Sequence, residues 1–145
     1  MKDKYIIHTD GGARGNPGPA AIGFVIEGPD IARVEKGEYL GETTNNEAEY
    51  RAPILALKKL KSTIGGDRAA AAEVEIYMDS ELVAKQMNKE YKIKHDGLQE
   101  LFMELWNLTI DFGSVTFHHV LRGKNATADR LVNEALDRES NKLPL

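Results

Sequence analysis

The sequence predicts an α/β fold in which helices pack on a mixed five-stranded sheet. Segments rich in β-branched and aromatic residues alternate with turn residues, and segments of helical periodicity separate the later ones. The first three strand-like segments follow one another directly, so we expect an antiparallel meander, with parallel strands added through the helices. A chain of 145 residues suits one domain with one core, spanning residues 1–145.

The predicted strands are apolar or alternating segments that end at Gly, Pro or Asp: Tyr5–Thr9, Ala20–Glu27, Ile31–Leu40, Glu73–Met78 and Val115–Leu121. Residues 10–19 are so rich in Gly and Pro that we expect an irregular loop after the first strand. These strand ends predict that Asp10 and Asp79 each come directly after a strand.

Capping residues and spacing predict four helices, over Thr43–Lys61, Ser80–Met87, Gly97–Thr109 and Thr127–Ser140. Pro53 lies inside the first of them, where it cannot donate a hydrogen bond to the carbonyl of Glu49. We therefore expect a kink there, unless the helix starts late and holds Pro53 in its first turn.

Composition limits the chemistry that is available. The absence of cysteine excludes disulfides, thiol nucleophiles and Cys-based zinc sites, so a metal would need oxygen or imidazole ligands. We find no apolar run of membrane-spanning length and no signal-peptide pattern, which predicts a cytoplasmic protein. The net charge of −4 disfavours a broad basic face for nucleic acid, but bound cations can supply positive charge locally.

Four carboxylates occupy positions typical of a site. Asp10 and Asp79 are expected at the carboxyl ends of strands, where α/β sheets gather their sites. Asp129 shares a helix face with Val132 and Leu136 near the helix start. Glu49 lies on a helix stripe expected to face the sheet, whereas Glu47 lies on the other face; that stripe comprises Asn46, Glu49, Tyr50, Pro53, Ile54, Leu57 and Leu60.

If these acids converge, their charges repel one another unless cations neutralise them. Hard oxygen ligands of this kind suit Mg²⁺ or Mn²⁺. Taken singly, Asp10 and Asp79 could be turn or capping residues, Asp129 a helix N-terminal acid, and Glu49 the partner of a Lys or Arg. The hypothesis of a metal site therefore depends on the set.

The contexts of these acids resemble the type 1 ribonuclease H family, from Tyr5 to about Arg138. Four segments in the family's order carry the resemblance: residues 9–19 (TDGGARGNPGP), residues 43–50 (TTNNEAEY), residues 78–80 (MDS) and residues 122–135 (RGKNATADRLVNEA). The resemblance implies a ribonuclease H-like fold. It also implies that Asp10, Glu49, Asp79 and Asp129 are catalytic acids that bind two Mg²⁺ ions, with Mn²⁺ as a substitute.

The implied activity is hydrolysis of the RNA strand of RNA–DNA hybrids by two metal ions, giving 5′-phosphate and 3′-hydroxyl ends. In this family the positions of Gly11, Gly12, Asn16, Asn45 and Asn46 contact the minor groove, where RNA displays 2′-hydroxyls. Thr44 resembles a contact to a phosphate of the DNA strand. Asn45 and Asn46 could equally be plain helix caps, and the glycines plain turn formers. We expect a monomer.

Two features depart from many family members. The mobile His loop is short here, and Arg122 stands near its place, either as a functional substitute or as a surface cation; His118 and His119 are expected to be sheet residues without a catalytic role. A basic extra helix is missing between Met87 and Gly97, which predicts weaker and more salt-sensitive hybrid binding. That segment retains some charge in Lys85, Lys89, Lys92 and Lys94.

Three alternatives stay open. The chain could be another nuclease of the same fold, such as a 3′–5′ exonuclease or a resolvase-like endonuclease, although the Asn45-Asn46 pair favours the hybrid-cutting type. It could be an inactive module that only binds hybrids, which the presence of all four acids disfavours. A purely structural domain would leave Glu49 on its stripe unexplained.

Overall fold

The computed structural model describes residues 2–142 and confirms the predicted α/β fold. Its five-stranded sheet has the order β3-β2-β1-β4-β5. β2 pairs antiparallel with β1 and β3, whereas β4 runs parallel to β1 and β5, which is the predicted meander with parallel additions. The strands are β1 (Lys4–Ala13), β2 (Gly18–Glu27), β3 (Val34–Thr43), β4 (Glu73–Met78) and β5 (Ser114–His119).

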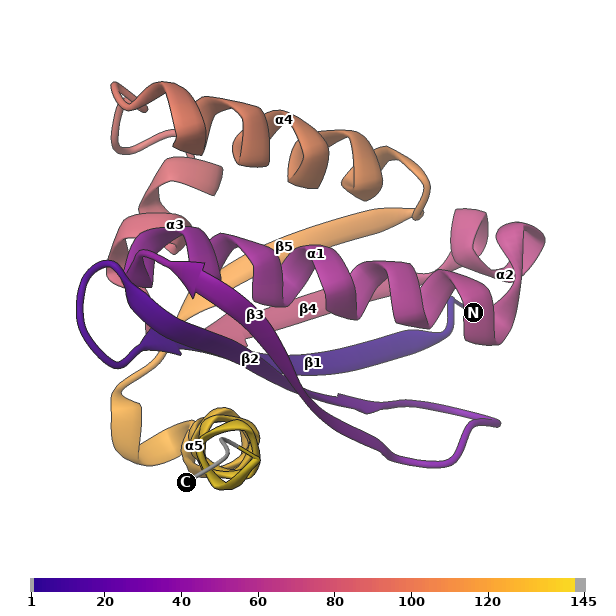
Figure 1. Cartoon of the computed structure of the whole chain (residues 1–145). Coiled ribbons are helices and arrows are strands. Elements are labelled where there is room, and N and C mark those ends of the chain that lie inside the picture. Colours follow the sequence, from indigo (N-terminus) through magenta and orange to yellow (C-terminus); the bar gives the residue numbers. More distant parts are fainter. Residues whose placement is uncertain (1, 143–145) are drawn as a thin grey trace.

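Helices cover both faces of the sheet. Figure 1 shows α1 and α4 on one side of the sheet and α5, seen end-on, on the other. Within residues 2–142, no helix combines the length and apolar character needed to cross a membrane. The helices are α1 (Asn45–Ile64), α2 (Gly66–Ala71), α3 (Glu81–Met87), α4 (Asp96–Ile110) and α5 (Ala126–Asn141), with a 3₁₀ turn at Arg122–Lys124.

Two apolar clusters correspond to the two helix layers. The larger lies between the sheet and α1 and α4, and includes Tyr5, Tyr50 and Leu105. The smaller lies beneath α5 and comprises Ala21, Val132, Ala135 and Leu136, with Tyr39 packed against it. The position of Asp129 on the Val132–Leu136 face therefore turns that acid toward the sheet, as the helical spacing predicts.

Helix α1 is buried over more than the predicted stripe because α4 packs against it as well as the sheet. Ala48, Ala52 and Ala56 are fully buried in addition to the predicted apolar residues. Asn46, predicted to face the sheet, is exposed, so that part of the stripe is wrong.

The first strand is longer than predicted. The expected irregular loop over residues 10–19 is wrong for its first part, because β1 continues to Ala13. Asp10 pairs with Gly23 and Ala13 pairs with Ala20 on β2. Asp10 therefore lies within a strand instead of after one. The Gly-rich composition suggested a loop, but pairing with β2 supplies the hydrogen bonds that hold these residues extended.

Other boundaries also shift. The third strand begins at Val34 instead of Ile31 and runs to Thr43, and the fifth strand ends at His119 instead of Leu121. The short helix α2 was not predicted, because Gly65-Gly66 suggested only a helix end. The strand over Glu73–Met78 and the helix capped by Ser80 match their predictions.

Pro53 lies inside α1, which starts at Asn45, so the alternative of a late helix start is wrong. Helix α1 is one continuous helix from Asn45 to Ile64, and its ribbon is unbroken in Figure 1. Because proline has no N–H, the carbonyl of Glu49 lacks its usual helical donor at this point.

The connection between α3 and α4 contains no helix over residues 88–95. This confirms that the basic extra helix is missing. Gln86 anchors the connection, because its buried side chain accepts a hydrogen bond from the Tyr50 hydroxyl at 2.5 Å and donates to the Lys92 carbonyl at 3.2 Å. The connection is thereby tied to α1.

Candidate active site

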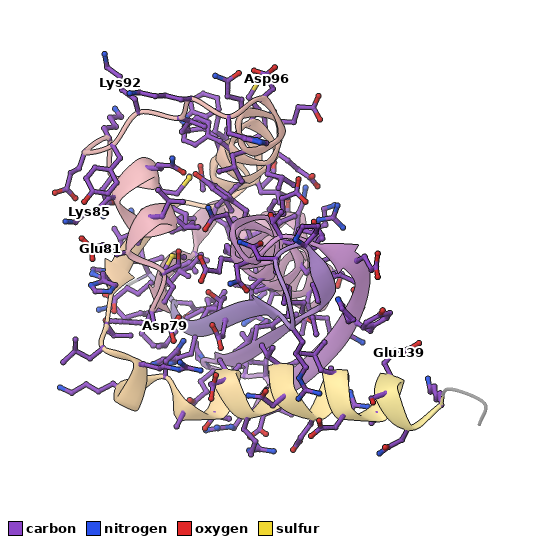
Figure 2. The ribbon with its side chains drawn as sticks, turned by 60° about the vertical axis from the view of Figure 1, so that its left-hand side comes forward. Asp79, Glu81, Lys85, Lys92, Asp96 and Glu139 are labelled. Atoms are coloured by element: carbon purple, nitrogen blue, oxygen red, sulfur yellow. The ribbon has the colours of Figure 1, made fainter. Side chains whose placement is uncertain are left out.

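All four predicted acids line one open cavity of about 470 Å³ at one end of the sheet. Asp10 comes from β1, Glu49 from the start of α1, Asp79 from the residue after β4, and Asp129 from the start of α5. Figure 2 shows Asp79 at the edge of the sheet that faces the beginning of α5. Acids from four distant parts of the chain therefore border the same space.

Gly11 brings α1 close to β1 at this end of the sheet. A Cβ atom at Gly11 would lie 2.3 Å from the Ala48 carbonyl oxygen and 2.6 Å from the backbone nitrogen of Glu49. Such distances are impossible for a real side chain, so only glycine permits this approach. The close contact places Glu49 beside the strand that carries Asp10.

Asp10 is the most perturbed of the four acids. Burial raises its pKa first, and the neighbouring Asp79 charge, a hydrogen bond with Asp79 and the Asp129 charge raise it further, to about 8. Burial and these neighbours therefore favour the protonated form of Asp10 in the metal-free protein. The same contributions show that Asp10, Asp79 and Asp129 lie close enough to repel one another.

Glu49 has a neutral partner in Ser80. Burial raises the pKa of Glu49, a hydrogen bond from the Ser80 side chain lowers it, and the Asp79 charge raises it again. The Ser80 oxygen also accepts a hydrogen bond from the Val83 amide at 3.2 Å, which caps α3. A single serine thus starts the helix after Asp79 and orients the carboxylate of α1.

Arg122 supplies a positive charge at the mouth of the cavity. Its guanidinium lies 3.3 Å from Asp129 Oδ1, and its side chain is 79% exposed. The hydrogen bond with Asp129 raises the pKa of Arg122 most, followed by the charges of Asp129, Asp10 and Asp79. Arg122 therefore sits in the field of three acids while most of its surface stays open to ligands.

Within the described range 2–142, no three His, Asp or Glu side chains are arranged as a ready metal site. The four acids surround the cavity instead of meeting at one point. Their chemistry nevertheless fits a divalent cation, because all donors are carboxylate oxygens and Asp10 retains a proton where a cation could bind.

Asn16 and Asn45 connect the end of β1 to the start of α1. Asn45 Oδ1 accepts a hydrogen bond from the Ala13 amide at 2.7 Å, and Asn16 Oδ1 accepts one from the Asn45 amide at 3.1 Å. Both bonds use the carbonyl oxygens of the side-chain amides. Helix capping at this point falls to Thr44, whose side chain accepts from the Glu47 amide at 3.2 Å.

The predicted substrate residues divide between two hollows. Gly11, Gly12 and Asn45 line the acid cavity. The remaining three line a smaller hollow of about 210 Å³, together with Glu47, His95 and Leu98; they are Asn16, Thr44 and Asn46. The expected contact residues thus flank the start of α1 on two sides.

Several residues at or near the site were not predicted, among them Ser80, His119 and Asn125. Ser80 was expected only as a helix cap, although its position next to Asp79 was the available signal. His119 lies at the end of β5, as expected of a sheet residue, and also lines the acid cavity. Asn125 is buried at the start of α5 and donates to the Thr9 carbonyl at 2.8 Å.

Comparison with known proteins identifies the family of this chain. The sequence matches the RNase H family over residues 2–137. The bifunctional protein Rv2228c of Mycobacterium tuberculosis is 39% identical over 136 residues, which make up 92% of this chain and 36% of that protein. Ribonuclease HI of Halobacterium salinarum is 40% identical over 131 residues, which make up 90% of this chain and 63% of that protein.

A solved structure of LC11-RNase H1 in complex with an RNA/DNA hybrid resembles the fold with a TM-score of 0.86 and 47% identity, covering 94% of this chain and 99% of that chain. The sheet order, the two helix layers and the acid-lined cavity define a ribonuclease H-like domain. The chain belongs to the RNase H family and, with these relatives, to its type 1. It spans 36% of the Mycobacterium protein and 63% of the Halobacterium protein.

Proposed function

We propose that the chain is a metal-dependent endoribonuclease that hydrolyses the RNA strand of RNA–DNA hybrids and leaves 5′-phosphate and 3′-hydroxyl ends. Membership of the RNase H family supports the reaction class, and the hybrid-bound LC11-RNase H1 supports the substrate class. The observation that carries the proposal is the single cavity bordered by Asp10, Glu49, Asp79 and Asp129.

These four acids are the proposed ligands of two Mg²⁺ ions, for which Mn²⁺ can substitute. When bound, the two cations would supply activation of the attacking water and stabilisation of the charge on the leaving 3′ oxygen. The protein's part is to hold acidic oxygens around the cavity. Ser80 orients Glu49 for this purpose, and the proton on Asp10 must leave when a cation enters.

Arg122 is the proposed auxiliary residue, in the place of the His loop of other members. Its exposed guanidinium can bind a phosphate oxygen of the cleaved strand while its contact to Asp129 keeps it at the cavity. Arg122 and a cation also compete for the same carboxylate. This competition gives the residue an opportunity to help release the product.

Recognition of the hybrid is assigned to the two hollows beside α1. The side-chain amides of Asn16 and Asn45 use their oxygens within the protein, so their NH₂ groups can donate to 2′-hydroxyls of the RNA strand. Asn46 is exposed next to them, Thr44 is the proposed phosphate contact, and Gly11 and Gly12 offer backbone in the acid cavity.

The test is cleavage of labelled RNA–DNA hybrid, double-stranded RNA and double-stranded DNA, each with Mg²⁺, with Mn²⁺ and with chelator. We expect cutting within the RNA strand of the hybrid in the presence of either metal and none with chelator. End analysis of the products then checks for 5′-phosphate and 3′-hydroxyl groups.

The other results of the same assay identify the alternatives. Stepwise shortening from a 3′ end would indicate an exonuclease, and cutting of branched DNA a resolvase-like enzyme. Tight hybrid binding without cutting in either metal would indicate a binding module. A monomeric state, cytoplasmic location and strong salt sensitivity of hybrid binding stay predictions, to be tested by sedimentation, by localisation and by binding across a salt series.

A further inference from the structure

Asn125 joins the backbones next to two of the acids. Its side-chain Nδ2 donates to the carbonyl of Thr9 at 2.8 Å, and Thr9 directly precedes Asp10 on β1. Its own backbone carbonyl accepts a hydrogen bond from the Asp129 amide at 3.1 Å, the first such bond of α5. Two hydrogen bonds through one residue thus connect the Asp129 backbone to the residue before Asp10.

Helix capping does not explain this asparagine. Asn125 occupies the N-cap position of α5, yet its side chain makes no hydrogen bond to the amides of the first turn. Asn125 is only 2% exposed, and its Oδ1 is the one buried side-chain polar atom within residues 2–142 that has no hydrogen-bond partner. A buried acceptor without a donor costs free energy. The group of Asn125 that makes a side-chain hydrogen bond is therefore its Nδ2 donor, which binds the Thr9 carbonyl.

Helix α5 also meets the sheet through close backbone packing at Gly23 and Gly37, an apolar cluster and exposed ion pairs. The cluster beneath the helix is made of Ala21, Val132, Ala135 and Leu136, whose apolar contacts have no preferred direction. The Arg130–Glu35 and Arg14–Asp137 ion pairs of α5 are exposed and join flexible side chains. The buried Asn125 bond is directional.

We propose that Asn125 is a positioning residue, which holds Asp129 in register with Asp10 so that both carboxylates reach the same bound cations. The inference rests on the proposed function, because it concerns the same metal-binding acids. The bond lies where support from the neighbouring strand ends, since Thr9 and Met78 are the last residues that pair between β1 and β4. Beyond Thr9, Asn125 continues the support that β4 no longer gives.

The test separates positioning from capping through the choice of substitution. Serine caps helices as well as asparagine does but is too short to take over the bond to Thr9, so Asn125→Ser removes only the cross-link. Asn125→Ala removes the whole polar group. The control Tyr5→Phe loses the 2.7 Å hydrogen bond from Arg68 at the other end of the sheet, so it disturbs the protein away from the acids.

Metal affinity is measured by calorimetric titration with Mg²⁺ and by the rise in Tm that Mg²⁺ causes, at a temperature where every variant is folded. Both Asn125 variants should bind Mg²⁺ about 10- to 100-fold more weakly than the unmodified protein, the usual effect of losing a group that orients a ligand. Their KM for hybrid at saturating Mg²⁺ should change less than about twofold. Tyr5→Phe should lower Tm without changing Mg²⁺ affinity.

Unchanged Mg²⁺ affinity in Asn125→Ser would overturn the inference, because the bond to Thr9 would then not be needed to place the cation ligands. The inference is also overturned if Asn125→Ser behaves like Tyr5→Phe, with a lower Tm and no change in Mg²⁺ affinity. If Asn125→Ala does not fold, the serine variant decides. Absence of Mg²⁺ binding or of hybrid cleavage in the unmodified protein would instead refute the proposed function.

Discussion

The charged residues at the two ends of the sheet are arranged differently: at one end they form ion pairs, and at the other acidic side chains lie close to one another. At the end where β1 begins, Lys4 pairs with Glu75 at 3.1 Å and Arg68 lies 3.7 Å from Asp3. At the end where β4 stops, Asp10 faces Asp79 and Asp129, and two cations, Arg14 and the largely exposed Arg122, line the cavity that these acids share with Glu49. The first end balances its charges within the protein, whereas the second leaves a surplus of negative charge around a cavity.

The pKa values at the two ends shift in opposite directions. A hydrogen bond from the Tyr77 hydroxyl and then one from Lys4 lower the pKa of Glu75. Burial and the charges of Asp79 and Asp129 raise that of Asp10 to about 8. An acid with internal partners is held ionised, and an acid among acids is held neutral. The surplus at the second end is what a bound cation would neutralise.

The largest expected effect comes from removing one acid of the cavity. Asp10→Asn and Asp79→Asn should each lower hybrid cleavage by about 1,000-fold or more, because in the proposed function these acids hold the cations that stabilise charge at the reacting phosphate. Circular dichroism should show an intact fold. The matched control is Asp67→Asn, an exposed acid on α2 far from the cavity, which should keep full activity. Near-normal cleavage by Asp10→Asn would remove that residue from the site.

The next effect is a pH dependence of stability in the presence of chelator. Because the pKa of Asp10 is raised from 3.8 to about 8 by folding, the folded state binds more protons between these values, and the free energy of unfolding falls as pH rises. Asp10→Asn should lack this loss and be more stable by about 2 kcal/mol at pH 8, less than a full shift would give, because the open cavity admits water and salt.

Urea unfolding at pH 5 and pH 8 measures this difference. Glu75→Gln is the opposite control, because folding lowers the pKa of Glu75. The ionised side chain therefore stabilises the protein at any pH above the pKa that Glu75 has in the unfolded state, and this contribution is lost as pH falls through the pKa that it has in the folded state. Glu75→Gln should therefore lower the free energy of unfolding to a similar extent at pH 5 and at pH 8, and the difference should disappear only as pH falls through the folded-state value. If Asp10→Asn gains no stability at pH 8, the acids do not repel one another as described.

A smaller effect is expected from Arg122→Ala. Loss of the exposed guanidinium should lower kcat/KM for hybrid by about tenfold, the effect of one charged hydrogen bond of roughly 1.4 kcal/mol. The same change should lower the Mg²⁺ concentration needed for half-maximal activity, because Asp129 loses a competing partner. Arg122→Lys keeps the charge as a control. Unchanged kcat/KM would make Arg122 a surface cation only.

Local sequence patterns were sufficient to predict most of the fold. Alternation in Glu73–Met78 and the cap at Ser80 depend on neighbouring residues, and both match the structure. The extension of β1 through Gly11-Gly12-Ala13 depends on pairing with β2, which composition does not reveal. The short helix α2 begins at the second of two glycines that suggested only a helix end, so the local signals were misleading there.

The site divides in the same way. The four acids were selected by their predicted positions, which were after a strand, on a helix stripe or near a helix start. In the structure all four border one cavity. The bond from Asn125 to Thr9 spans 116 residues of sequence, and no local pattern predicts it. The hydrogen bond from Ser80 to Glu49 likewise needs α1 and α3 to be placed first. Side-chain partners follow from the packing of distant elements.

The smallest expected effect tests whether the two ends are electrically independent. Lys4→Ala removes the exposed partner of Glu75, and the pKa of Glu75 should rise but stay below its ordinary value, because the Tyr77 hydroxyl still donates to it at 2.9 Å. Lys4 lies about 20 Å along β1 from Asp10, at roughly 3.3 Å per residue. This exceeds the screening length of about 10 Å at 0.1 M salt, so cleavage should change less than about twofold.

A carboxyl NMR titration of Glu75 and a hybrid cleavage assay give the two readouts for Lys4→Ala. A rise in the Glu75 pKa with unchanged cleavage would show that the paired end responds locally. A fall in cleavage as large as that of Arg122→Ala would mean that the field of Lys4 reaches the acid cavity. The surplus of negative charge would then be a property of the whole sheet and not of the end that carries Asp10 and Asp79.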